Sequence, residues 1–87
     1  QNFPNPFNPE TVIPLDIASD RIPLQLRIFN SNGQLVRTLF EGPLSAGQHR
    51  FLWDGLDDLG REVASGVYLY RAQIGSQTRV RKMNLVR

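Results

Sequence analysis

The sequence predicts an all-β fold, a small antiparallel β-sandwich, from three observations. Short apolar runs alternate with polar residues at a period of two, which is the pattern of strands with one buried face. These runs recur about every ten residues and are separated by Gly, Pro, Asn and Asp, the residues that favour turns. No stretch keeps a helical period for more than about two turns.

Size and composition restrict the chain to a narrow set of protein classes. Its 87 residues suit one domain, and 40% hydrophobic with 21% charged residues is typical of a globular chain. Cysteine is absent, which excludes disulfides and thiolate metal sites. A net charge of +2 is too small to indicate nucleic-acid binding. No apolar run approaches the roughly 20 residues that span a bilayer, so we expect no membrane-spanning segment.

The chain is expected to have two parts, a Pro-rich extended lead-in over residues 1–10 and the sandwich over residues 11–87. The three prolines of the lead-in fix φ and push each preceding residue toward extended geometry. Phe3 and Phe7 are predicted to pin this segment to the rim of the sandwich.

Two strands are expected in the first third of the sandwich, followed by a hairpin. Pro14 cannot donate a backbone hydrogen bond, so the first strand is an edge strand or turns that nitrogen to solvent. Residues 30–33, Asn-Ser-Asn-Gly, predict a tight turn. The returning strand is expected over residues 34–40, with its end at 41–43. The alternating apolar residues of the first two strands are Ile13, Leu15 and Ile17, then Leu24, Leu26 and Ile28.

The second half predicts two or three further strands and a closing one. The alternation slips in the closing strand, where Val80 and Met83 have opposite phases, and this predicts a β-bulge near Arg81-Lys82. The total is six or seven short strands, the spacing of an immunoglobulin-like antiparallel β-sandwich. The expected segments are a strand over 47–53, a loop over 54–60, an extended piece over 61–64, a strand over 67–74 and the closing strand over 78–87.

Aromatic and nucleophilic residues predict a core rather than an active site. Trp53, Tyr68 and Tyr70 could stack on a sugar, but they lie on core-facing phases and are interpreted as core. His49 is the only histidine, and no cysteine exists to complete a zinc site with it. Ser65 lies in a turn and lacks the flanking residues of a nucleophile elbow. We therefore expect no enzymatic activity and no cofactor.

An acidic loop contains Asp54, Asp57 and Asp58 around Gly55 and Gly60. Oxygen-rich loops of this kind can hold calcium. The loop lacks the spacing of a calcium-binding helix-loop-helix and its closing bidentate Glu. Asp and Gly also dominate ordinary turns, because Asp bonds the local backbone and Gly accepts left-handed geometry. An ordinary turn is the preferred interpretation, and a calcium site through the three aspartates is the alternative.

Charge is distributed unevenly along the chain. All eight acids lie at or before Glu62, so residues 1–62 carry −3 and residues 63–87 carry +5. One interpretation is a basic sheet edge that faces water and discourages edge-to-edge pairing. The other is a terminal segment presented to a partner.

Segments spread over almost the whole chain carry a recognisable pattern. They are Asn-Phe-Pro-Asn-Pro-Phe-Asn-Pro-Glu-Thr at 2–11, Ile-Phe-Asn-Ser-Asn-Gly-Gln-Leu-Val at 28–36, Trp-Asp-Gly-Leu-Asp-Asp-Leu-Gly at 53–60, Ala-Ser-Gly-Val-Tyr at 64–68 and Lys-Met-Asn-Leu-Val-Arg at 82–87. In this order and spacing they resemble the type A C-terminal sorting domains of the type IX secretion system, with Phe3 where that family usually has Tyr. The middle segments are also similar to the immunoglobulin-like domain of the flagellar hook-capping protein.

The resemblance implies a non-catalytic sorting and anchoring module at the C-terminal end of a larger exported protein. An N-terminal cargo domain would be covalently linked to it and would cross the periplasm. The outer-membrane translocon and its sorting and processing machinery would recognise the module, leaving the cargo secreted or at the cell surface. By position in the family pattern, recognition would fall on Gly66, Val67, Tyr68, Lys82, Met83, Leu85 and Arg87.

Two other functions stay open at this point. A carbohydrate- or wall-binding module would need Trp53 or a tyrosine on an exposed face. A structural spacer or assembly domain, including a hook-cap-like role, would need none of these.

Overall fold

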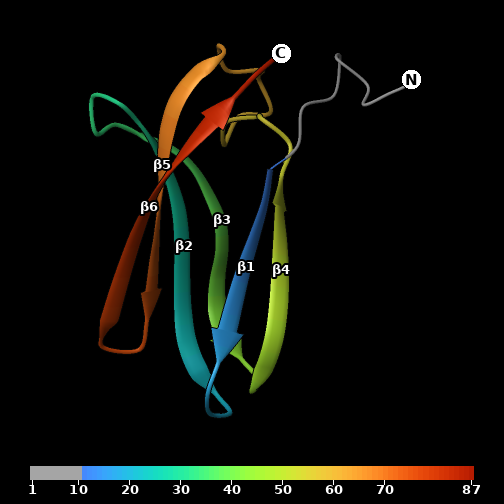
Figure 1. The fold of residues 1–87 in the computed structure, drawn as a ribbon, viewed down its shortest axis with the longest axis vertical. Coiled ribbons are helices and arrows are strands. Elements are labelled where there is room, and N and C mark those ends of the chain that lie inside the picture. Colours follow the sequence, from blue (N-terminus) through green and yellow to red (C-terminus); the bar gives the residue numbers. More distant parts are fainter. Residues whose placement is uncertain (1–10) are drawn as a thin grey trace.

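The structure, a computed structural model, describes residues 11–87 and consists of six antiparallel strands in two sheets (Figure 1). This confirms the predicted all-β sandwich. Within residues 11–87 no helix is long and apolar enough to cross a membrane. The predicted lead-in over residues 1–10 lies outside the described residues. The strands are β1 (Thr11–Ile17), β2 (Ile22–Asn30), β3 (Leu35–Leu44), β4 (Gly47–Trp53), β5 (Gly66–Ile74) and β6 (Gln77–Leu85).

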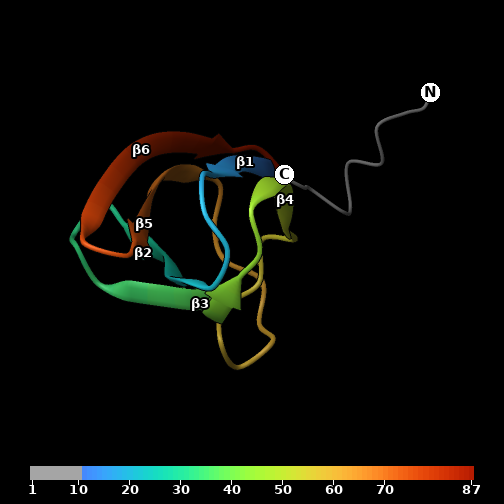
Figure 2. The ribbon, with the colours of Figure 1, turned by 90° about the horizontal axis from the view of Figure 1, so that it is seen from below.

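The larger sheet has the order β3-β2-β5-β6, and the smaller one pairs β1 with β4. Seen along the strands, the larger sheet curves around one side of the molecule and the β1–β4 pair lies on the other (Figure 2). β1 pairs only with β4, which confirms the edge position predicted from Pro14.

The core lies between the two sheets and receives side chains from both. It contains the alternating apolar residues of β1 and β2, which confirms the faces predicted from their period of two. β6 contributes to the core only near its C-terminal end. The buried residues are Ile13, Leu15, Ile17, Leu24, Leu26, Ile28, Trp53, Tyr68, Ala72, Met83 and Leu85.

The β2–β3 connection is the predicted hairpin. The side-chain oxygen Oδ1 of Asn30 accepts hydrogen bonds from the backbone N–H groups of Asn32 and Gln34, both at 3.0 Å. Gly33 adopts a φ of 82°, which is accessible to glycine because it lacks a Cβ atom. The predicted end of β3 at residues 41–43 is wrong, since the strand continues to Leu44 in register with β2.

The predicted bulge at Arg81-Lys82 is also wrong, because the β5–β6 register is unbroken from end to end. Val80 lies on the outer face of the sheet, opposite Arg71, and is 55% exposed. The inward phase of β6 carries Arg81 in its first half, and that position is exposed. Inward-facing residues of a strand must be apolar only where the opposite sheet covers them. The inward-facing arginines in the first half of β6 are exposed, so they fit the sheet without a bulge. The register shifts occur instead between β2 and β3, at Leu26/Arg27 and Ile28/Phe29.

The extended piece predicted over residues 61–64 does not form a seventh strand. It contributes one isolated bridge, in which Glu62 pairs with Leu56.

Candidate functional site

The seven residues singled out by the family pattern are brought together at one end of the β5–β6 pair. The register places Gly66 opposite Leu85 and Tyr68 opposite Met83. Lys82, Val67 and Arg87 lie within the same few residues of these two strands, near the C-terminal end marked in Figure 1. A local sequence pattern in two separate segments therefore corresponds to one place in the fold.

Three of these seven residues are core residues. Tyr68, Met83 and Leu85 are buried, and the ring of Tyr68 meets that of Trp53 edge-on with centroids 5.1 Å apart. The Tyr68 hydroxyl donates a hydrogen bond of 2.6 Å to the carbonyl oxygen of Ala64. These contacts confirm that Trp53 and Tyr68 form the core, and they leave neither ring free to stack on a sugar.

Three of the seven residues are exposed, and they lie within a few residues of one another on the strand pair, with Lys82 opposite Leu69. Gly66 begins β5, Val67 follows it on the outer face, and Lys82 extends from the same face of β6. Gly66, Val67 and Lys82 are therefore the residues of the pattern that are most open to solvent.

The seventh residue, Arg87, is held against the domain rather than presented to solvent. Its guanidinium donates hydrogen bonds to the carbonyl oxygens of Gly55, at 2.6 Å, and of Val63. Nη1 also lies 3.6 Å from a carboxylate oxygen of Glu62, and the Arg87 backbone N–H donates to Ser65 Oγ. The side chain is only 20% exposed. Arg87 therefore fastens the end of β6 to the segment that connects β4 to β5.

The connecting segment is fixed from the opposite side by Arg37 and Trp53. The Trp53 indole Nε1–H donates to the carbonyl oxygen of Leu56 at 2.9 Å, and Arg37 donates to the same oxygen at 3.2 Å. Arg37 also forms an ion pair of 3.1 Å with Asp54, whose Oδ1 accepts from the Leu56 backbone N–H.

The other two aspartates of the loop accept hydrogen bonds from different parts of the backbone. Asp57 Oδ1 accepts from the N–H groups of Leu59 and Arg61, each at 2.9 Å. Asp58 Oδ1 accepts from the N–H of Thr38 on β3, also at 2.9 Å. The three carboxylates do not converge on a point, and within residues 11–87 no group of three His, Asp or Glu side chains could hold a metal ion. The geometry favours the turn interpretation of these residues.

His49 is half-buried, and its Nε2 lies 2.9 Å from the carbonyl oxygen of Ser45. Its ring stacks on Phe51 at a centroid distance of 6.4 Å. Both contacts fix the orientation of the His49 ring and are typical of a structural histidine.

One hollow among the described residues, of about 250 Å³, borders the connecting segment, and its lining includes Leu35, Asp57, Asp58 and Val63. Others lie at the far end of the molecule. One of these, of about 380 Å³, is lined by residues that include Arg21, Pro23, Glu41 and Gly75. These come from the end of the sandwich opposite to Arg87, where the β1–β2 and β5–β6 turns are (Figure 1). Its lining brings together no pair of groups suited to nucleophilic or acid–base catalysis.

Asp57 makes a pH dependence predictable. The N–H of Arg61, and then that of Leu59, hold the pKa of the Asp57 carboxyl below its usual value. Because the pKa is lower in the folded chain than in the unfolded one, the stabilisation is complete above the unfolded pKa and is lost as pH falls through the folded pKa. We expect an Asp57→Asn variant to lose part of this acid sensitivity, as measured by thermal melts between about pH 2 and 6. An unchanged difference in melting temperature across that range would contradict the assignment.

The family model of the FlgD Ig-like domain matches residues 8–78. The chain belongs to this family. No curated protein matches the chain. Among solved structures, the crystal structure of FlgD from P. aeruginosa matches with a TM-score of 0.67 and 21% identity. The match covers 88% of this chain and 59% of that FlgD chain, so this chain spans about three fifths of the FlgD chain's length.

The FlgD comparison confirms the immunoglobulin-like fold and the part of the resemblance that concerned the hook-capping family. Nothing in these comparisons supports the type IX sorting family. The FlgD Ig-like match ends at residue 78, so Lys82, Met83, Leu85 and Arg87 lie beyond it.

Sequence reasoning missed the roles of Arg37 and Arg87 as donors to loop carbonyl oxygens. A basic residue carries no periodic signal for such a role, because a hydrogen bond to a distant carbonyl depends on the tertiary path of the chain.

Proposed function

We propose that this chain is a non-catalytic assembly module of a larger exported protein. Membership in the FlgD Ig-like domain family supports a structural role, since the domain there is part of a longer chain. The observation that carries the proposal is the use of the polar groups at the candidate site. The side chains of Asp54, Asp57 and Arg87 form hydrogen bonds with backbone groups of the segment between β4 and β5, which stiffens the domain. These three side chains are therefore occupied and offer no pair of groups for acid–base or nucleophilic catalysis.

The test is a domain exchange in the parent polypeptide. The 87 residues are replaced by an unrelated immunoglobulin-like domain of similar size, and the parent's export and its incorporation into a larger particle are measured separately. We expect export to continue and incorporation to fall. If incorporation were unchanged after the exchange, the domain would act only as a spacer. A catalytic activity of the purified chain would contradict the proposal.

A second candidate function is sorting through the type IX secretion translocon. It is favoured by one specific observation, that the exposed Gly66, Val67 and Lys82 of the family pattern lie within a few residues of one another on β5 and β6. In this function the translocon and its processing machinery recognise that end. The covalently linked cargo then becomes secreted or attached to the cell surface after crossing the periplasm.

The sorting function is tested by fusing the 87 residues behind a periplasm-directed fluorescent reporter. Trimming residues 82–87 would also remove the buried Met83 and Leu85, so a point variant is the better probe. In a bacterium with a working translocon, Lys82→Ala is expected to abolish surface fluorescence, while Arg81→Ala, at an adjacent residue that is also exposed, leaves it unchanged. Equal surface fluorescence in a translocon-null strain, or reporter held in the periplasm in both strains with the domain folded, would rule sorting out.

A further inference from the structure

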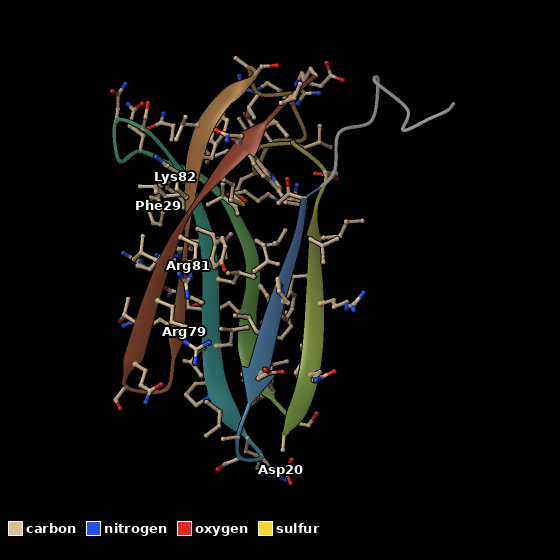
Figure 3. All side chains as sticks on the ribbon, in the orientation of Figure 1. Asp20, Phe29, Arg79, Arg81 and Lys82 are labelled. Atoms are coloured by element: carbon tan, nitrogen blue, oxygen red, sulfur yellow. The ribbon has the colours of Figure 1, made fainter. Side chains whose placement is uncertain are left out.

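The outer face of the four-stranded sheet carries an apolar row across three strands. Phe29 on β2 lies directly opposite Leu35 on β3 and Leu69 on β5. The row ends at Lys82, which lies opposite Leu69 on β6. In the view of Figure 3, Phe29 and Lys82 lie at the same level of the sheet. This row is turned away from the core, because the buried residues of β2 occupy the other phase.

Part of this row is open to solvent. Leu35 is 47% exposed, Phe29 and Leu69 are half-buried, and Val67 and Val80 add exposed apolar surface on the neighbouring strands. Contiguous apolar surface on a soluble domain marks interaction sites more often than apolar residues scattered singly.

A basic row lies immediately beside the apolar one. Arg27 on β2 and Arg71 on β5 are directly opposite each other in the register. Like charges in this relation destabilise a sheet. The Arg71 guanidinium lies over the Phe29 ring, 4.9 Å from its centroid, and Arg71 Nη2 donates to Gln25 Oε1 at 3.3 Å.

These cations are only partly compensated within the domain. Glu41 lies 3.9 Å from Arg27 and is largely exposed. The Nε atoms of both Arg27 and Arg71 are buried without a hydrogen-bond partner among the described residues. A partner reaches the outer guanidinium nitrogens rather than these buried Nε atoms. The Arg27 side chain is 30% exposed, so a carboxylate from outside the domain can accept a hydrogen bond from it.

We propose that this outer face, formed by Phe29, Leu35, Leu69, Arg27, Arg71 and Lys82, binds a partner protein through carboxylates flanked by apolar side chains. Aromatic residues and arginine are enriched at protein interfaces, and a carboxylate can take two hydrogen bonds from one guanidinium. The partner's apolar side chains cover the Phe29 row while its carboxylates neutralise the Arg27–Arg71 pair. The inference rests on the assembly function and names the surface through which assembly occurs.

A protein partner fits this face better than nucleic acid or a membrane surface. Nucleic-acid binding depends on many phosphate contacts along a basic stripe, whereas this face offers three cations and an acid on a chain of net charge +2. Membrane-surface segments project apolar side chains beyond a basic rim, whereas Phe29 and Leu69 are half-buried in the plane of the sheet.

The test measures binding of the purified chain to a short peptide of alternating glutamate and valine by ¹⁵N chemical shifts. We expect shifts at Phe29, Leu69 and Arg71 and none with a peptide of alternating lysine and valine. Lys82→Glu is expected to raise Kd at least about fivefold, because it reverses a charge on the outer face. The matched control is Arg81→Glu, which makes the same charge change on the other face of β6 and is expected to change Kd by less than about twofold.

A second pair of variants tests the apolar row. Leu35→Ser is expected to weaken binding, whereas Leu52→Ser, at a leucine that is 51% exposed on the β1–β4 sheet, is expected to leave it unchanged. Because both leucines are similarly exposed, a loss of folding would affect the two variants alike and would be seen in their melting curves.

Several outcomes would overturn the proposal. They are the absence of shifts at about 1 mM peptide, shifts confined to other strands, and equal losses in Lys82→Glu and Arg81→Glu. Sedimentation of the chain with phosphatidylserine vesicles, lost in Lys82→Glu and without peptide binding, would identify a membrane surface instead. The domain exchange in the parent has a separate readout, so assembly could persist while this surface is refuted.

Discussion

Trp53→Ala is expected to lower the free energy of unfolding by about 3–5 kcal/mol, the usual range for removing a buried aromatic side chain. Trp53 is fully buried at the end of β4 and packs edge-on against Tyr68. The substitution also removes the donor to the Leu56 carbonyl oxygen, so the loop after β4 loses one of its attachments. In a domain of this size the loss is comparable with the whole stability.

Calorimetric melting measures this effect without relying on indole fluorescence, which the variant lacks. Leu52→Ala is the control, since the neighbouring Leu52 is exposed on the other side of β4 and its loss should cost less than about 1 kcal/mol. Equal melting temperatures for the Trp53 variant and the unmodified chain would place Trp53 at the surface. That result would restore the sugar-stacking interpretation.

Arg87→Ala is expected to cost about 2 kcal/mol, from the loss of charge-assisted hydrogen bonds to two carbonyl oxygens. The side chain is 20% exposed, so solvent screens these bonds only in part. Arg87→Lys is expected to recover less than half of the loss, because an ammonium group cannot reach both oxygens with the geometry of a guanidinium.

Urea denaturation of the three chains measures these differences. Arg81→Ala is the matched control, an exposed arginine on the neighbouring strand β6 for which we expect a change of less than about 0.5 kcal/mol. If Arg87→Ala and Arg81→Ala had the same midpoint, the contacts of Arg87 with the loop would contribute nothing to stability.

The period of two was sufficient to predict most of the fold. It identified the buried faces of β1 and β2 and the core position of Trp53, because burial on one face imposes alternation directly. It failed in β6, where Val80 suggested a bulge. Alternation reports burial only where an opposite layer is present, and the first half of β6 has no such cover.

The candidate surfaces were harder to predict than the strands. Alternation places Arg27 and Arg71 on outward phases but does not say that they face each other. That relation depends on the pairing of β2 with β5, and such long-range register is set by the packing of the whole sheet. The contacts of Arg87 could not be predicted for the same reason, because its partners Gly55 and Val63 belong to a segment outside the regular strands.

The central place of β2 in its sheet has a consequence for biosynthesis. β2 pairs on one side with β3, which follows it through a short hairpin, but its other neighbour β5 begins only at Gly66. A chain synthesised from its N-terminus can therefore form the β2–β3 hairpin early, while the four-stranded sheet must wait for the last quarter of the domain. Pairings this distant along a chain form slowly. The complete four-stranded sheet can therefore form only after most of the domain has been synthesised.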